Sequence, residues 1–593
     1  MSDSSSSVAR LVRRSAPQTT DDAPPTGRSD RTDAGSGLAR RIGRVVPGSG
    51  GTGQWVYVVG AVALAALAVG LRAFHQTQAY ELFMDEVQYA DVANSFAAGR
   101  GAELFDEPFY LHPPLAFLYF SLFVTHPVDH MTVGAVLGLR PALLVFAFVN
   151  TLLVVAVTRR VVGRWASLVS GLVYALDAFV VRFDSRVMLE APMMFCVLAG
   201  VLCLLVAVER ETVPARRAFL VAGGVFFGLA VTTKSTSGLI TAVPLMIMIV
   251  TAWGLRRREA AGVLGLQFGV YGVYVLIVLL RGDIGWWFDQ TLAGTFRAVG
   301  LIKETGFTAH SNSPGFVSRI LANLSLFASS YALIGVAVCY ALYLLLIGWR
   351  TLRSPRTRRR GAHAAPAGGA HGRIRAGDPR VSADPAEATL SLVTCWLAGV
   401  LAAILYTGAL GEVEEQTFYL LAVPSTVVIG LLVTQAGRWR APWRVLVGVA
   451  VVALFAGSLA GWWQVHTTRD DAYARVIPQV FAQVDHSAQI CLGEQTAQFV
   501  MPGFGVHKLT SLDVARRNDC RYAMVSTALS AQGLANSSTE LNAELARDFP
   551  VVISAHGRTS GDLLVYDLDR PLPGSTTRAV APDDRSLPLT GPA

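Results

Sequence analysis

Residues 55–90 read WVYVVGAVALAALAVGLRAFHQTQAYELFMDEVQYA. The stretch opens with a run of about twenty apolar residues, enough to cross the hydrocarbon core of a bilayer as a helix. It then becomes polar, and two adjacent carboxylates, Asp85 and Glu86, follow. The stretch predicts a first membrane span near 55–74 with an acidic pair at the membrane surface beyond it.

The same apolar texture continues through most of the chain. Of its 593 residues, 52% are hydrophobic and only 16% are charged, which is too apolar for a soluble protein of several domains. We expect an α-helical polytopic membrane protein with about eleven transmembrane helices. The predicted spans lie near 55–74, 133–157, 165–181, 187–208, 218–233, 237–254, 262–280, 330–349, 389–410, 417–434 and 443–463.

Arginine gathers in every second short loop between these spans, whereas loop 75–132 holds one basic residue, Arg100. Because positively charged loops stay in the cytoplasm, we expect a multi-pass protein of the plasma membrane with its N-terminus inside. Loop 75–132 and the C-terminal region then lie outside. The net charge of +8 follows from this topology and gives no case for binding nucleic acid.

The chain divides into segments of different composition. Residues 1–53 are too polar to form a core, which predicts a disordered cytoplasmic tail. A membrane domain is expected over 54–465, interrupted by a disordered cytoplasmic loop at 354–387. Residues 466–570 alternate short apolar runs with polar helical stretches, which predicts a small extracytoplasmic α/β domain. A disordered tail, 571–593, follows.

Two of the six cysteines, Cys491 and Cys520, fall in the predicted C-terminal domain. Oxidation is chemically permitted outside the cell, so we hypothesise that they form a disulfide. The other four lie in apolar spans as small core residues. No spacing of Cys and His indicates a zinc site.

Charged residues also mark two turns on the outer side. The connection between the third and fourth spans is so short that Asp184, Arg186 and Glu190 must lie at the membrane face, where unpaired charge is costly. They belong either to a structural ion pair or to a site. The next outward turn carries Lys234 among hydroxyl groups, a setting that suits a phosphate oxygen or a snorkelling lysine.

Two further outward segments leave alternatives open. An acidic cluster at 412–415, followed by Tyr419, could bind sugar hydroxyls, orient a cation or face water. Loop 281–329 carries adjacent tryptophans, which are ordinary residues of a membrane interface and also suit stacking on a sugar. The sequence does not compel a metal ion, and a divalent cation is one alternative.

In their order along the chain, these features resemble a known superfamily. The first span, Asp85-Glu86 and then His112-Pro113-Pro114-Leu115 are similar to the first outer loop of GT-C glycosyltransferases, in the protein O-mannosyltransferase and lipid A aminoarabinose transferase branches. Ser185–Glu190 and Gly228–Lys234 are similar to mannosyltransferase segments. The resemblance is close over about the first two-fifths of the chain and implies the GT-C fold.

The resemblance implies a hexosyl- or pentosyltransferase that takes a sugar from a polyprenyl phosphate in the membrane and passes it, with inversion, to an acceptor hydroxyl. Carried over by position, Asp85 matches the general base and Glu86 its neighbour, and Arg186 and Lys234 match groups near the lipid phosphate. The remaining candidate substrate-binding residues are Tyr89, His112, Asp184, Glu190, Glu415 and Tyr419.

The match has limits. Ser235 stands where the mannosyltransferases usually have Trp, and the C-terminal region is not the repeat domain of the eukaryotic members, so protein O-mannosylation is not implied. The acceptor stays open among protein, glycolipid and polysaccharide. The high usage of Ala, Arg, Gly and Val resembles an actinobacterial chain, which favours cell-envelope glycans.

A membrane transporter or flippase for a lipid-linked or anionic substrate is the alternative function, because buried charges such as Asp184 and Arg186 also line substrate pathways. The sequence shows no inverted repeat and no pair of broken helices in corresponding halves, as many transporters have. A transferase therefore accounts better for the acidic outer loop.

Overall fold

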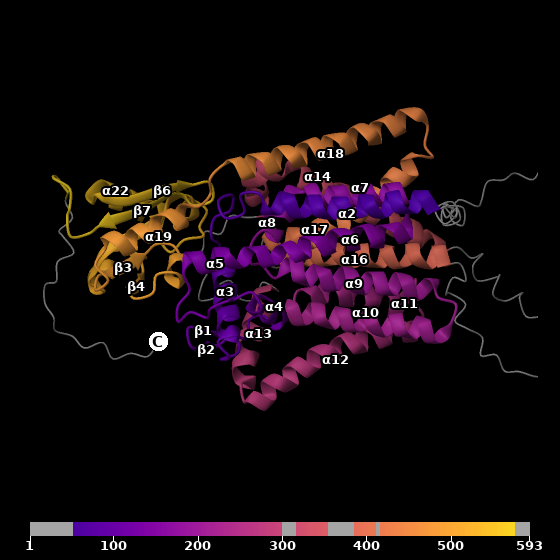
Figure 1. Cartoon of the computed structure of the whole chain (residues 1–593), viewed down its shortest axis with the longest axis horizontal. Helices are drawn as coiled ribbons and strands as arrows, with labels where there is room; N and C mark the ends of the chain where they lie inside the picture. The colour runs from indigo at the N-terminus through magenta and orange to yellow at the C-terminus, as the bar shows by residue number, and fades with distance from the viewer. Residues whose placement is uncertain (1–50, 299–315, 354–384, 411–414, 576–593) are drawn as a thin grey trace, which may run out of the picture.

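The computed structural model describes residues 51–298, 316–353, 385–410 and 415–575. The described chain is an elongated bundle of long helices with a small domain containing a sheet at one end (Figure 1). The predicted disordered segments lie for the most part outside the described residues.

Within the described ranges, eight helices are long and apolar enough to cross a membrane, and a bent pair of helices counts as a ninth span. Two further apolar stretches, α11 (Ser237–Thr251) and the part Glu387–Ala402 of α16 (Pro385–Leu410), belong to helices that pack against each other. Each predicted span falls on one of these elements, which confirms a polytopic helical membrane protein. The long helices are α2 (Gly51–Ala73), α5 and α6 (Val133–Leu139 and Leu144–Val161), α9 (Glu190–Glu209), α10 (Val213–Thr233), α12 (Arg257–Arg281), α14 (Phe316–Arg353), α17 (Glu415–Ala436) and α18 (Ala441–Thr467).

The bent pair consists of α7 (Arg164–Leu176) and α8 (Ala178–Asp184), which meet at 62°. Asp177 lies at the bend, and its wholly buried side chain accepts a 2.9 Å hydrogen bond from the backbone N–H of Val180. A carboxylate that captures a backbone N–H in this way caps a new helix and competes with continuation of the old one. The single span predicted over 165–181 is therefore two helices.

Loop 75–132 is an ordered layer at the end of the bundle. It contains α3 (Met84–Ala97), a hairpin of β1 (Glu103–Leu104) and β2 (Glu107–Pro108), and α4 (Leu115–Ser121). At the hairpin tip Phe105 and Asp106 have φ values of 55° and 62°, the left-handed backbone of a two-residue turn. The helix α13 (Ile284–Ala298) lies nearby, and its Gln290 bonds the backbone of Tyr110.

The C-terminal domain is a small α/β unit, as predicted. Its five-stranded sheet has the order β4-β3-β5-β7-β6, in which β4, β3 and β5 are parallel and β7 and β6 are antiparallel. The sheet is accompanied by α19 (Ala472–Gln483) and three shorter helices. The strands are β3 (Gln489–Leu492), β4 (Gly505–Lys508), β5 (Cys520–Ser526), β6 (Val551–Gly557) and β7 (Gly561–Asp567), and the short helices are α20 (Leu512–Arg517), α21 (Thr527–Ala531) and α22 (Thr539–Asp548).

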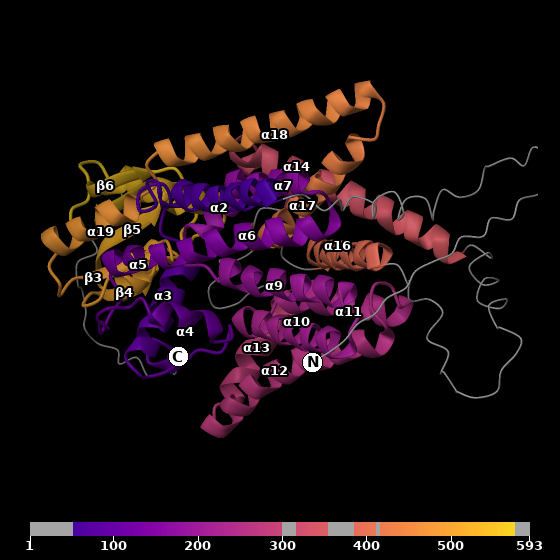
Figure 2. The ribbon, with the colours of Figure 1, turned by 45° about the vertical axis from the view of Figure 1, so that its right-hand side comes forward.

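The C-terminal domain contacts loop 75–132 and the helix α5 that follows it. Phe105 of the hairpin stacks on Phe499 of the domain with ring centroids 5.0 Å apart. Helix α19 contacts α5, and the two helices lie at the same end of the bundle in both views (Figure 2). The loop that carries Asp85 is therefore held between the membrane helices and the C-terminal domain.

The hypothesised disulfide between Cys491 and Cys520 is present and joins the neighbouring strands β3 and β5, with Cα atoms 5.6 Å apart. The four remaining cysteines are free. The bond closes a loop of 29 residues and so restricts the unfolded chain.

We expect the double variant Cys491→Ser/Cys520→Ser to lower the free energy of unfolding of the C-terminal domain by about 2–4 kcal/mol, because the unfolded chain regains loop entropy. Thermal unfolding with and without reductant measures the effect. Cys339→Ser is the matched control, because Cys339 is an exposed free thiol. Two additional reactive thiols in the non-reduced wild type would contradict the bond.

Candidate active site

Asp85 and Glu86 lie in the first turn of α3. Negative charge is favoured there by the exposed N–H groups and the dipole of the helix. Their surroundings differ, because Asp85 is half-buried whereas Glu86 is wholly buried. Only Asp85 of the pair is accessible to a small molecule at this end of the bundle.

Glu86 forms a bidentate ion pair with Arg140, whose Nε and Nη2 each donate a 2.8 Å hydrogen bond to the carboxylate. Both side chains are inaccessible to solvent. The Glu86 carboxylate also accepts a 3.0 Å bond from the backbone N–H of Val187. Glu86 thereby ties the start of α3 to the turn before α9. The sequence reading missed Arg140, whose only signal was a single arginine inside a predicted span.

Arg186 stands beside this pair in the turn between α8 and α9. Its guanidinium lies 5.3 Å from the ring centroid of Tyr80 and 5.8 Å from that of Phe83. The side chain is 4% exposed, and its Nε and Nη2 donate no hydrogen bond within the described part of the chain. Burial and the nearby Arg182 lower the pKa of Arg186 to about 10, so the group is still a cation at neutral pH. A buried cation with unused donors is suited to an anionic oxygen.

Lys234 and Glu190 form a buried ion pair of 2.5 Å. Lys234 is the C-terminal cap residue of α10, and Glu190 is the first residue of α9. The structure thus joins two predicted site residues from different turns. The ion pair brings the Lys234 ammonium group to the first residue of α9, the helix that follows Arg186 in the chain.

Asp184 and Tyr419, both predicted to bind substrate, lie together inside the bundle and are wholly buried. Asp184 receives hydrogen bonds of 2.8 Å from Tyr174 and from Tyr419, and it pairs with Arg72 at 2.9 Å. Of the ion pairs considered for Arg186, neither forms, because Arg72 is the partner of Asp184 and Lys234 that of Glu190. Asp184 therefore joins α2, α7, α8 and α17.

The other predicted substrate-binding residues fall in different places. The hydroxyl of Tyr89 on α3 lies 3.0 Å from Nε2 of His112, which immediately precedes the Pro-Pro step into α4. Glu415 begins α17, and positions 411–414 of the acidic cluster lie outside the described residues. No three His, Cys, Asp or Glu side chains converge as a metal site within the described residues.

Taken together, the residues provide the elements of a transfer from a phosphate ester. A half-buried carboxylate at Asp85 could accept a proton, and the buried cation Arg186 could receive negative charge. The buried pairs of Glu86 and Glu190 hold these groups at the start of α3 and α9. A charge in such a poorly hydrated setting interacts more strongly than it would in water.

We expect Arg72→Met to lower the free energy of unfolding by about 3–5 kcal/mol, because it leaves the Asp184 carboxylate buried without its cation. Unfolding of the detergent-solubilised protein measures the loss. The double variant Arg72→Met/Asp184→Asn removes both charges and should recover most of it. Equal stability of the wild type and the single variant would contradict the role given to the pair.

Comparison with known proteins gives a family match and a fold match. Residues 131–293 match the dolichyl-phosphate-mannose-protein mannosyltransferase family. The segment contains Arg186, Glu190 and Lys234 and begins after Asp85. A search of curated proteins finds no match.

Among solved structures, the oligosaccharyltransferase of Archaeoglobus fulgidus in the apo form is similar with a TM-score of 0.53 and 10% identity, covering 86% of this chain and 74% of that one. The archaeal oligosaccharyltransferase AglB from Archaeoglobus fulgidus, in complex with an inhibitory peptide and a dolichol-phosphate, is similar with a TM-score of 0.50 and 11% identity, covering 86% of this chain and 74% of that one. ArnT from Cupriavidus metallidurans bound to undecaprenyl phosphate gives a TM-score of 0.45 and 15% identity, covering 86% of this chain and 98% of that one.

The apolar helices and the shared fold define the class, a multi-pass membrane protein with the GT-C architecture. The family match over residues 131–293 agrees with the resemblance that the motifs gave.

Proposed function

We propose that this protein transfers a sugar from a polyprenyl phosphate to a hydroxyl of its acceptor on the extracytoplasmic face of the plasma membrane. The observation that carries the proposal is the half-buried Asp85 at the start of α3 together with the buried Arg186 and its unused donors. Their chain neighbours Glu86 and Val187 are joined by a hydrogen bond. The mannosyltransferase match supports a sugar carried on a lipid phosphate, and the similar archaeal enzyme was solved with a dolichol-phosphate.

In this mechanism Asp85 takes the proton of the acceptor hydroxyl as its oxygen attacks the anomeric carbon. The bond from that carbon to the phosphate oxygen breaks, and the lipid phosphate leaves with the electron pair. Arg186 stabilises the charge that develops on the phosphate, and Lys234, oriented by Glu190, adds positive charge. A single displacement inverts the anomeric configuration.

The remaining site residues act by support in this proposal. Glu86 holds the first turn of α3 through Arg140 and Val187. Tyr89 and His112 line the same loop and are proposed to contact the sugar or the acceptor. Asp184 and Tyr419, at the centre of the bundle, keep the helices in place.

The proposed orientation has the N-terminus in the cytoplasm and the C-terminal domain outside. Alternation of arginine-rich loops supports it. In the proposed division, 54–465 forms the membrane transferase and 466–570 the extracytoplasmic domain. The transporter alternative loses part of its support, because Asp184 and Glu190 have buried protein partners.

We expect Asp85→Asn to reduce transfer by about 10²–10⁴-fold, because the amide cannot take the acceptor proton. Membranes carrying the variant are assayed with labelled polyprenyl-phosphate sugars against the wild type. Asp91→Asn, which removes a half-buried carboxylate further along α3, is the matched control and should stay active. Undiminished transfer by Asp85→Asn at equal expression would refute the assignment of the base.

A further inference from the structure

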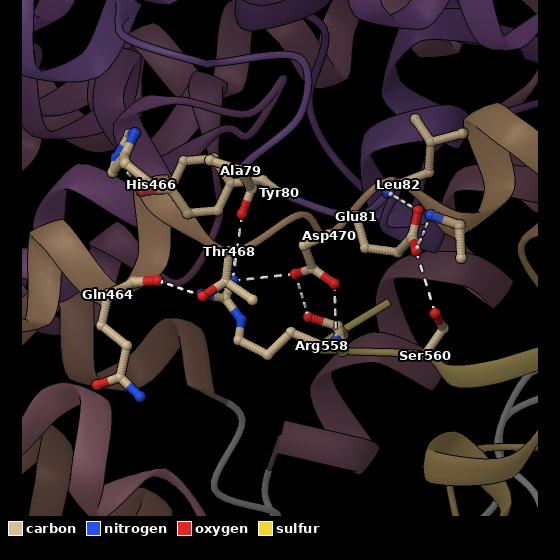
Figure 3. A network of polar contacts seen from close by, with 12 residues as sticks. Ala79, Tyr80, Glu81, Leu82, Gln464, His466, Thr468, Asp470, Arg558 and Ser560 are labelled. Atoms are coloured by element: carbon tan, nitrogen blue, oxygen red, sulfur yellow. Dashed lines mark hydrogen bonds and ion pairs between the residues drawn. The ribbon is translucent and has the colours of Figure 1, made fainter. Parts of the chain in front are cut away.

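Glu81 lies in the segment between α2 and α3 and is 2% exposed. Its carboxylate accepts hydrogen bonds from the backbone N–H groups of Ala472 at 2.8 Å and Tyr473 at 3.2 Å. The hydroxyl of Ser560 donates a third bond of 3.1 Å (Figure 3). All three donors belong to the C-terminal domain, 391 to 479 residues further along the chain.

Ala472 and Tyr473 are the first two residues of α19. The N–H groups in the first turn of a helix have no partner within the helix and are usually capped by the preceding side chain. In α19 that residue, Asp471, makes no capping bond. Glu81 supplies the cap instead, from a different part of the fold, and its negative charge suits the helix start.

A second set of bonds lies within the C-terminal domain and reaches the segment before α3 through Arg558. Asp470 accepts bonds from the backbone N–H of Thr559 at 2.7 Å and from Arg558 at 2.9 Å. Arg558 also donates to the carbonyl of Ala79. A Cβ on Gly557 would stand 2.8 Å from the Glu81 carboxylate, so only glycine permits this close approach.

On its other side, the segment is fixed by Arg140. Besides its pair with Glu86, Arg140 donates to the carbonyl oxygens of Gln76 at 2.7 Å and Tyr80 at 3.0 Å. The backbone from Gln76 to Glu86 is thus fixed by two sets of hydrogen bonds. Arg140 makes one set, and Glu81 makes the other with the C-terminal domain. Asp85 lies within the held stretch.

We propose that Glu81 is a positioning residue for Asp85 and that the C-terminal domain acts on transfer through it. The inference rests on the proposed function and extends it to a residue that the mechanism does not use. Because the C-terminal domain binds the segment just before Asp85, its docking fixes the position and orientation of the Asp85 carboxylate. Small displacements of a reacting group are costly, with about 10²-fold lost for 1 Å.

The experiment compares full-length wild type with Glu81→Gln at pH 8. The charged groups that face Glu81 are Asp470 and its partner Arg558. Burial and the negative charge of Asp470 raise the pKa of Glu81 to about 7. Because the assay pH lies above this pKa, the Glu81 carboxylate is ionised in the assay. The amide keeps the shape but has one acceptor oxygen, and its NH₂ would face N–H donors.

Glu494→Gln is the matched control. Glu494 is also a buried carboxylate that accepts two backbone N–H bonds, from Thr496 and Ala497, and a third bond from the hydroxyl of Tyr473 on α19. It contacts the start of α19 but not the segment before α3, because all these partners lie within the C-terminal domain. Gly557→Ala perturbs the same contact from the C-terminal domain, because its added Cβ would crowd the Glu81 carboxylate. It replaces Glu81→Gln as the test variant if Glu81→Gln does not fold.

Two readouts are taken, amide hydrogen exchange and steady-state transfer. We expect Glu81→Gln to speed exchange at the start of both α19 and α3 and to lower kcat by about 10- to 100-fold with little change in the KM for the donor. Glu494→Gln should affect exchange only within the C-terminal domain and leave kcat unchanged.

Faster exchange in α19 alone, or an unchanged kcat despite faster exchange in α3, would overturn the positioning role. An equal loss of kcat in Glu494→Gln would overturn it as well, because general damage to the domain would then suffice. If the wild type transfers no sugar from any polyprenyl phosphate, the proposed function fails, and exchange at α3 still decides whether the two segments are coupled.

Discussion

The ion pair between Arg140 and Glu86 is the constraint on which the candidate site depends. A buried arginine is tolerated only when its donors are used, and here they reach a carboxylate and the backbone carbonyls of Gln76 and Tyr80. Those acceptors lie in the segment that leads into α3 and in the first turn of that helix. The pair therefore fixes the path of that segment as well as cancelling two charges, and Asp85 is oriented as a consequence.

Charge compensation also separates the roles of the other polar residues. Glu86, Asp184 and Glu190 each have a buried cationic partner, so their charges are accounted for by the fold. Arg186 differs, because its neighbours are mainly aromatic rings and two of its nitrogens donate no hydrogen bond within the described chain. Since burying a charged group with unsatisfied hydrogen-bond donors is expensive, these unused donors are the best physical argument for an anionic ligand.

The sequence predicted well what a bilayer or a local pattern dictates. Apolar runs located the spans because only a helix satisfies its backbone in lipid, and Cys491 and Cys520 were recognised as a pair because the texture around them changed. It predicted poorly what depends on distant partners. Arg72 meets Asp184 across 112 positions and Arg140 meets Glu86 across 54, and no local pattern encodes either contact. The break at Asp177 was missed because the surrounding apolar run is continuous.

The C-terminal domain is bound to the site by the same requirement that buried polar groups be satisfied. A domain joined only by a flexible linker would have to cap its own helix, whereas α19 takes its acceptor from Glu81. The exchange is mutual, since Glu81 could not remain buried without the N–H groups of α19 and the hydroxyl of Ser560. Glu81 satisfies the N–H groups at the start of α19, and these N–H groups satisfy the buried Glu81 carboxylate. The segment before Asp85 and the C-terminal domain therefore become ordered together, which makes the domain part of the framework of the site.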